Sequence, residues 1–228
     1  IGYMLQRVLG NELRKIGVRQ NVIAVVTQVL VDPEDPAFTN PTKPIGPFYT
    51  ESRAKRLQEQ RGYAMREDAM RGWRRVVPSP DPIAIVERDT IKSLVESGKV
   101  VISSGGGGIP VVRDDNGYLV GVEAVIDKDL AGQRLARDLA ADVFLILTDV
   151  DRVALFFGRP NQQFLDRAIV ADLRRWQSEN HFRPGSMGPK IEAAIRFVEQ
   201  GGKEAIITSL SMAAKALDGA GTHIVRTA

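Results

Sequence analysis

The sequence predicts an α/β protein, a three-layer α/β/α sandwich with a mostly parallel central sheet and a small protruding subdomain. Apolar β-branched runs alternate with segments of helical periodicity over most of the chain, which is typical of a parallel sheet covered by helices on both faces. Prolines and charges fill residues 33–80 instead, a stretch too long for an ordinary connection. We therefore expect a single domain over residues 1–228 with a protruding subdomain inserted at residues 33–80. A flexible charged insertion is the alternative.

The first expected elements are a helix and a strand. Apolar residues recur at helical spacing from Ile1 to Ile16, and Gly17 provides a stop, so an amphipathic helix that packs on a sheet is expected there. Residues 22–31 are a near-continuous β-branched run. Such a run predicts one strand that is buried on both faces, as in a parallel sheet.

The later elements continue the alternation. Residues 82–98 predict a short segment and a helix, with Asp89 or Thr90 as its cap and Gly98 as its stop. Residues 114–117 predict a turn. Strands are expected at residues 100–103, 118–122, 143–148, 205–208 and 223–225, and helices at residues 128–141, 169–180 and 190–200.

The composition narrows the classes of function. With 43% hydrophobic and 26% charged residues, the chain is an ordinary globular protein. Its 31 Lys and Arg against 28 Asp and Glu are too balanced to indicate nucleic acid, but they are compatible with a small anionic substrate. The absence of cysteine excludes disulfides, thiolate nucleophiles and Cys-ligated zinc. No apolar stretch is long enough for a membrane span and no signal peptide is apparent, so we expect a cytoplasmic protein without a membrane partner.

An apolar strand at residues 100–103 leads into four consecutive glycines, residues 105–108. Backbone without side chains allows a ligand close to the main chain, and amide-rich turns favour anions. No Lys-Ser or Lys-Thr follows the glycines, which excludes a Walker P-loop, and the extended residues after Pro110 exclude a glycine motif that opens a helix. The run predicts a phosphate or carboxylate ligand, and an ordinary loop or linker is the alternative.

Two lysines are expected at the starts of helices. Lys128 lies between Asp127 and Asp129, and two carboxylates can hold a lysine toward a phosphoryl group. The alternative is a solvated helix start with an aspartate cap.

Lys190 follows Pro189, which fits a first helical turn. A lysine there opposes the helix dipole, which is reasonable if a phosphate compensates it; a loop with a chance lysine is the alternative.

Weaker candidates lie elsewhere. Asp149 and Asp151 follow a predicted buried strand and could contact a ribose or a metal, although capping of a turn is the better interpretation from the residues alone. Lys43 lies in the predicted subdomain and could reach across the mouth of a site, but an isolated surface lysine usually has no function. His181 and His223 form no ligand pair, and a structural role is expected for each.

These motifs together resemble the carbamate kinase family of the amino acid kinase superfamily. The resemblance covers essentially the whole chain, and its most specific parts are residues 125–129 and 185–190. The resemblance implies reversible phosphoryl transfer between ATP and carbamate, giving ADP and carbamoyl phosphate, with Mg²⁺ accompanying ATP and no protein metal ligand assigned. A homodimer without a nucleic-acid partner is also implied. The segments that carry the resemblance are residues 2–6, 40–49, 73–80, 104–110, 123–131, 146–153 and 185–190.

The resemblance also implies roles for individual residues. Lys128 and Lys190 would neutralise the transferring phosphoryl group, Asp129 would orient the two lysines, and Lys43 would reach over the site. The carbamoyl side would be held by Ser104, Gly105, Gly106, Gly107 and Gly108. The nucleotide would be bound by Thr148, Asp149, Val150, Asp151, Ser186, Met187 and Gly188.

Two departures from the family pattern are visible. Family members begin with a strand ending in Gly-Gly-Asn and have a later Gly-Asn-Gly turn, and neither occurs in these residues. We therefore expect an N-terminally truncated chain that is inactive or poorly folded alone, which a normal rate of ADP phosphorylation by the 228 residues would contradict. Residues 154–156 stand where a more polar stretch is expected. Another acyl-phosphate-forming kinase and an inactive binding or assembly module remain the alternative functions.

Overall fold

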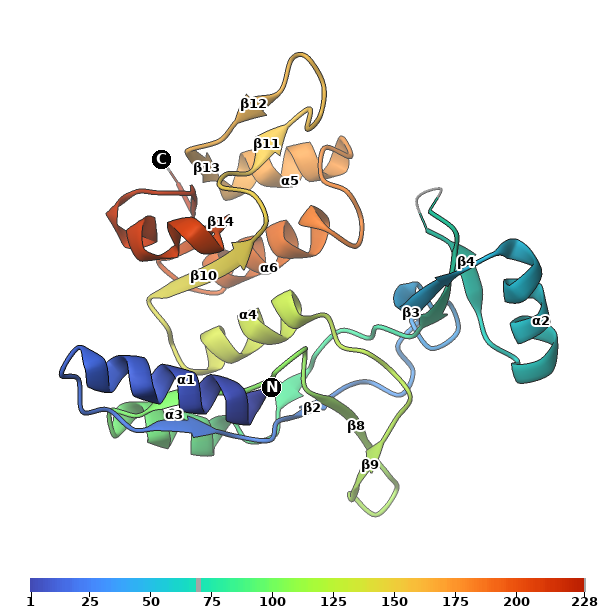
Figure 1. Cartoon of the computed structure of the whole chain (residues 1–228), viewed down its shortest axis with the longest axis horizontal. Helices are drawn as coiled ribbons and strands as arrows, with labels where there is room; N and C mark the ends of the chain where they lie inside the picture. Colours follow the sequence, from blue (N-terminus) through green and yellow to red (C-terminus); the bar gives the residue numbers. More distant parts are fainter. Residues whose placement is uncertain (69–70, 228) are drawn as a thin grey trace. The chain divides into compact units, whose positions relative to one another are not determined.

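The structure is a computed structural model that describes residues 1–68 and 71–227 (Figure 1). It divides into two compact units, Ile1–Lys128 and Asp129–Ala228. Both units combine helices with sheets that contain parallel strand pairs, so the predicted mixed α/β class is confirmed. The expected single domain over residues 1–228, with a subdomain at residues 33–80, stays a prediction.

The first unit begins with helix α1 (Gly2–Lys15), which packs on a two-stranded sheet. Strand β1 (Val22–Ala24) pairs in parallel with β7 (Val100–Ile102) in that sheet. The expected helix at the start of the chain is therefore confirmed. Its contact with the sheet is close, because a Cβ on Gly2 would lie 3.3 Å from the Cβ of Ala24.

The run at residues 22–31 is not one strand, contrary to the sequence-based expectation. Three residues separate β1 from strand β2 (Gln28–Leu30), which belongs to another sheet. The run is also not buried throughout, because Val26 is 76% exposed while Thr27 is only 4% exposed. The Thr27 hydroxyl donates to the carbonyl oxygen of Val25 at 3.1 Å, a local bond of the kind that competes with a continuous strand.

The second sheet of this unit has the strand order β6-β2-β8-β9. Strand β2 pairs in parallel with β8 (Ile109–Arg113) and antiparallel with β6 (Ala84–Ile85). Strand β9 (Leu119–Gly121) returns along β8. The predicted turn between β8 and β9 is confirmed, because the Asp114 carboxylate accepts from two following backbone N–H groups and Gly117 has φ +84°.

Helix α3 (Arg88–Glu96) ends as predicted, with Gly98 in the left-handed region at φ +76°. Its start differs from the prediction, because the N-cap is Glu87 rather than Asp89 or Thr90 and no side chain caps the first turn. The Glu87 carboxylate instead accepts hydrogen bonds from the backbone and side-chain amides of Gln28.

Residues 43–77 contain a three-stranded antiparallel sheet and one helix. The strand order is β3-β5-β4, with β3 (Lys43–Tyr49), β5 (Trp73–Val77) and β4 (Met65–Glu67). Helix α2 (Glu51–Arg61) follows β3 and ends at Gly62, which has φ +66°. Buried Ala54, Met65, Val76 and Val77 supply the apolar contacts of this part.

The second unit is built on the sheet β10-β14-β15-β13. Strand β10 (Val143–Thr148) pairs in parallel with β14 (Glu204–Ser209), and β13 (Arg167–Ile169) pairs in parallel with β15 (Thr222–Val225). Strands β14 and β15 are antiparallel. A small hairpin, β11 (Ala154–Leu155) with β12 (Gln163–Phe164), is separate from this sheet.

Strand β10 is not the fully buried strand that the sequence predicts. Ile146 is buried, but Leu145 and Leu147 are exposed on alternate positions. The reason is that Phe144 and Ile146 pack in the core on one face of the sheet, while successive side chains of a strand point to opposite faces.

Helices α4 (Lys128–Asp138), α5 (Val170–Ser178) and α6 (Met187–Glu199) follow the predicted order. Helix α6 is the most buried of the three, and its apolar residues pack against the sheet. Pro189 lies in its first turn as predicted, although α6 begins at Met187 rather than at residue 190. The 3₁₀ helix η1 (Leu210–Asp218) contacts β10 and β14.

Charged residues join α5 to α6. Arg174 on α5 pairs with Glu192 and Glu199 on α6, both at 2.7 Å. Burial opposes ionisation of Glu192, but hydrogen bonds from Arg196 and Gln177 and the charges of Arg174 and Arg196 outweigh it, so the pKa of Glu192 is lowered.

We expect Glu192→Gln to lower the free energy of unfolding at pH 7 by about 1 kcal/mol, with allowance for the partial exposure of the carboxylate. Because folding lowers the pKa of Glu192, the stability that its carboxylate contributes is complete at pH values above 4.5, the ordinary pKa of glutamate. That contribution is lost as the pH falls through the lowered pKa of the folded state. Denaturant unfolding of both proteins between neutral and acid pH should therefore show a difference that disappears in acid. A difference independent of pH would contradict this account.

Candidate functional site

The four glycines form the connection from β7 to β8, as the sequence predicts. The backbone is left-handed at Ser104, Gly105, Gly107 and Gly108, with φ between +49° and +130°, a region that glycine enters without strain. Gly105 and Gly106 are exposed. Within the described residues, the N–H groups of Gly106 and Gly108 donate to no protein acceptor, so they are available to an anion.

Gly107 has a different function from its exposed neighbours. It is buried, and a Cβ at this position would lie 2.2 Å from the carbonyl oxygen of Ile126. No side chain fits there, because the clash would be with main-chain atoms. Gly107 therefore allows the segment that ends in Asp127 and Lys128 to lie directly on the glycine loop.

The open side of the glycine loop faces a cavity of about 650 Å³ in the first unit. Ser104, Gly105, Gly106 and Gly108 line it, together with apolar residues of α1 and β1. Gly107 is not among the lining residues, which agrees with its burial against Ile126. The Ser104 hydroxyl oxygen is buried and has no hydrogen-bond partner among the described residues.

Lys43 lies at the first position of β3 and pairs with Asp127, at 2.6 Å between Nζ and Oδ2. Both side chains are largely buried. Lys43 is therefore not an isolated surface lysine, and its ammonium group is fixed next to the residue that precedes Lys128.

Lys190 pairs with Asp129 in the second unit, at 2.8 Å between Nζ and Oδ2, and both side chains are buried. Asp129 lies in the first turn of α4, where a carboxylate is favoured by the helix dipole. Lys190 lies in the first turns of α6, where the dipole favours an anion instead. The carboxylate of Asp129 therefore compensates an otherwise unfavourable buried cation.

The triplet Asp127-Lys128-Asp129 is not a solvated helix start. Each aspartate is only 7% exposed, and each holds a lysine that is distant in the sequence. Asp129 contacts Lys190, one of the two lysines that it is predicted to orient, and its role in orienting them stays a prediction. Taking charges out of water costs free energy that pairing only offsets. The two pairs therefore fix the positions of the lysines and add little to the stability of the fold.

A second group of predicted residues lines one cavity of about 250 Å³ in the second unit. Asp149 and Val150 come from the segment after β10, and Ser186 and Met187 come from the start of α6. The structure thus brings together two of the predicted nucleotide-binding segments. Sequence reasoning did not assign to this cavity the other lining residues, Arg152, Ala154, Phe157, His181, Phe182 and Arg183.

Three predicted nucleotide-binding residues do not line this cavity. The Thr148 hydroxyl donates to the Asp149 carboxylate at 3.1 Å, and the backbone oxygen of Asp151 accepts from Thr208 at 3.1 Å. The N–H of Gly188 donates to the carbonyl oxygen of Arg183 at 2.9 Å. A Cβ on Gly188 would lie 3.0 Å from the same oxygen, so this glycine allows the loop before α6 to pack closely.

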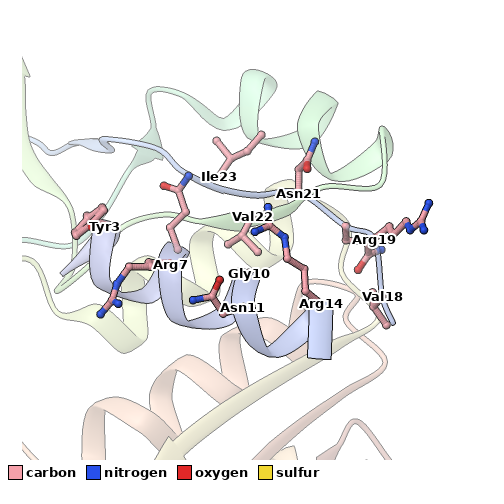
Figure 2. Close-up of a pocket in the computed structure, with 12 residues that line it drawn as sticks. Tyr3, Arg7, Gly10, Asn11, Arg14, Val18, Arg19, Asn21, Val22 and Ile23 are labelled. Atoms are coloured by element: carbon pink, nitrogen blue, oxygen red, sulfur yellow. The ribbon is translucent and has the colours of Figure 1, made fainter. Parts of the chain in front are cut away.

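A further cavity, of about 670 Å³, lies on α1 and the segment that leads into β1 (Figure 2). Figure 2 shows Arg7, Asn11 and Arg14 projecting from α1, and Asn21 on the segment that leads into β1. None of the predicted site residues lines it.

Among residues 1–68 and 71–227, no group of three or more His, Asp or Glu side chains could hold a metal ion, and no helix has the length and apolar character of a membrane span.

Comparison with known proteins identifies the family. Residues 19–209 match the model of the amino acid kinase family. Carbamate kinase from Pyrococcus furiosus is 56% identical over 99% of this chain and 72% of its own length. A carbamate kinase-like protein of Escherichia coli, YqeA, is 53% identical over 96% of this chain and 70% of its own length.

The similarity extends to the structure. Carbamate kinase from Giardia lamblia bound to AMP-PNP superimposes with a TM-score of 0.89 at 46% identity, over 99% of this chain and 72% of the other. Similarity of this extent in sequence and structure does not arise from a shared fold alone. The chain belongs to the carbamate kinase family, within the amino acid kinase family, and is a kinase.

Proposed function

We propose that the protein catalyses reversible phosphoryl transfer between ATP and carbamate, forming ADP and carbamoyl phosphate. The observation that carries the proposal is the buried Lys190, which Asp129 holds at the amide end of α6. A fixed cation at the start of a helix, where the helix dipole favours an anion, suits a transferring phosphoryl group. The name of the Pyrococcus furiosus relative and the AMP-PNP bound to the Giardia lamblia enzyme support the two substrates.

The chemistry needs positioning and charge neutralisation more than a base. An oxygen of carbamate attacks the γ-phosphorus of ATP, and the bond from that phosphorus to the bridging oxygen breaks, so that ADP leaves with the electron pair. Carbamate already carries the anionic oxygen, so no proton has to be removed. Mg²⁺ enters as part of the nucleotide substrate, since Mg²⁺ is commonly held by substrate phosphates with few protein ligands.

Within this proposal each group of residues has one role. The exposed amides of the glycine loop receive the carbamoyl group, and Lys128 and Lys190 neutralise the phosphoryl group, with Asp129 fixing Lys190. Lys43, fixed by Asp127, supplies a further positive charge. The cavity lined by Asp149 and Met187 is proposed to bind the nucleotide.

The proposal is tested with the complete gene product that contains this chain. Formation of ATP from ADP is measured with carbamoyl phosphate, and in parallel with acetyl, aspartyl and glutamyl phosphates. The rate of ATP formation with carbamoyl phosphate should greatly exceed the rate with each of the other three acyl phosphates. Preference for another acyl phosphate would indicate a different kinase of the superfamily, and turnover of none would indicate a binding or assembly module.

We expect Lys43→Met to lower kcat/KM for carbamoyl phosphate by about 10²-fold, because one charge that faces the reacting groups is removed. The matched control is Lys55→Met, which breaks a solvent-exposed pair with Glu51 of similar length, 2.7 Å. The control should retain the parent rate, since exposed pairs contribute little. Equal rates for the two variants would exclude Lys43 from the site.

A further inference from the structure

Thr27 lies in the three-residue break between β1 and β2, and no role in the site follows from its place in the sequence. Its side chain is neither exposed nor part of an apolar cluster, because it is 4% exposed and makes hydrogen bonds instead. Burying a hydroxyl group costs free energy unless the group is hydrogen-bonded. The partners therefore indicate what the residue does.

Both ends of the glycine loop are bound to this one residue. At the beginning of the loop, the N–H of Ser104 donates to the Thr27 hydroxyl oxygen at 2.9 Å. At its end, the N–H of Ile109 donates to the Thr27 backbone oxygen at 2.9 Å. The hydroxyl in turn donates to the carbonyl oxygen of Val25 at 3.1 Å, which fixes its own orientation.

The loop needs such a support because of its composition. Glycine-rich backbone loses much conformational freedom when it is ordered, and Ser104 is held at φ +60°, a region that side chains disfavour. The loop also lies close to Thr27, because a Cβ on Gly108 would be 3.3 Å from the Thr27 backbone oxygen. Without the hydroxyl, the N–H of Ser104 would lose its partner and the first half of the loop would lose its anchor.

We propose that Thr27 is a positioning residue, which holds the amides of Gly106 and Gly108 in place for the carbamoyl acceptor by binding the loop at Ser104 and Ile109. The assignment of an acceptor rests on the proposed function; the anchoring itself does not. Thr27 also lines the cavity that the glycine loop faces, but it is only 4% exposed, and in this proposal it acts through the loop. Its removal should therefore impair binding at the loop and leave the nucleotide side unaffected.

The test compares Thr27→Val, which keeps the shape but removes the hydroxyl, with Thr27→Ser, which keeps the hydroxyl. In the complete gene product, Thr27→Val should raise KM for carbamoyl phosphate about tenfold or more, with KM for ADP within about twofold of the parent. Thr27→Ser should restore KM for carbamoyl phosphate to within about threefold. Equal impairment by both variants, or parallel changes in the two KM values, would overturn the proposal.

Hydrogen exchange separates this proposal from the proposed function. The amide of Ser104 should exchange faster in Thr27→Val than in the parent and in Thr27→Ser, without any substrate present. If the complete gene product does not use carbamoyl phosphate but this difference is found, the proposed function fails and the anchoring of the loop stands. Unchanged exchange at Ser104 would overturn the anchoring, whatever reaction the enzyme catalyses.

Discussion

Replacing Lys190 with alanine should lower kcat for ATP formation from ADP and carbamoyl phosphate by about 10³-fold or more. The ammonium group is buried and fixed by Asp129 at 2.8 Å, so water cannot take over its role without rearrangement of the site. A steady-state assay of the complete gene product measures this effect. A variant that retains more than about a tenth of the parent rate would be inconsistent with the proposed role.

The same substitution also affects folding, and the two effects have to be separated. Lys190→Ala leaves the carboxylate of Asp129 without its lysine in a buried position, which costs about 3–5 kcal/mol of stability. The double variant Asp129→Asn/Lys190→Met removes both charges, and it should recover most of that stability in denaturant unfolding while remaining inactive. Recovery of turnover in the double variant would show that the lysine acts on folding alone.

Replacing Gly107 with alanine should destabilise the protein by about 3 kcal/mol and also reduce turnover. A Cβ there would lie 2.2 Å from the oxygen of Ile126, and φ is +130°. Neither the loop nor the facing segment can yield without main-chain movement. Because that segment leads into Asp127 and Lys128, the movement would displace the pair that Asp127 forms with Lys43.

Gly106 supplies the matched control for this prediction. A Cβ on Gly106 would meet no atom within 4 Å, and its φ is not positive. Gly106→Ala should therefore change the free energy of unfolding by no more than about 0.5 kcal/mol. Thermal or denaturant unfolding of the two variants gives the comparison, and similar losses for both would contradict the distinction between the two glycines.

The sequence is sufficient for the α/β class, the order of the main helices and the residues at the two helix starts. Those features depend on local periodicity and on residue types that suit helix ends, such as Pro189 followed by Lys190. The identity of the partners is not local. The pairs of Asp127 with Lys43 and of Asp129 with Lys190 join residues 84 and 61 positions apart, and no spacing rule predicts which lysine each aspartate holds.

The incorrect predictions have a common physical origin. The run at residues 22–31 reads as one strand because valine and isoleucine dominate its periodicity, while the break reflects the pairing of its two halves with strands of different sheets. His181 and Arg183 were not expected at the cavity of Asp149 for a similar reason. They lie in a loop, where side-chain direction is set by tertiary packing and leaves no periodic pattern in the sequence.

The burial of α6 determines how long Lys190 keeps its position during heating. Ile191, Ile195 and Val198 on this helix are almost completely inaccessible, so the helix can leave its place only when the core of its unit opens. Segments of this kind open with the whole cooperative unit, whereas exposed loops open at low cost. Lys190 is therefore retained for as long as its unit is folded, while the exposed glycines 105 and 106 can lose their order first.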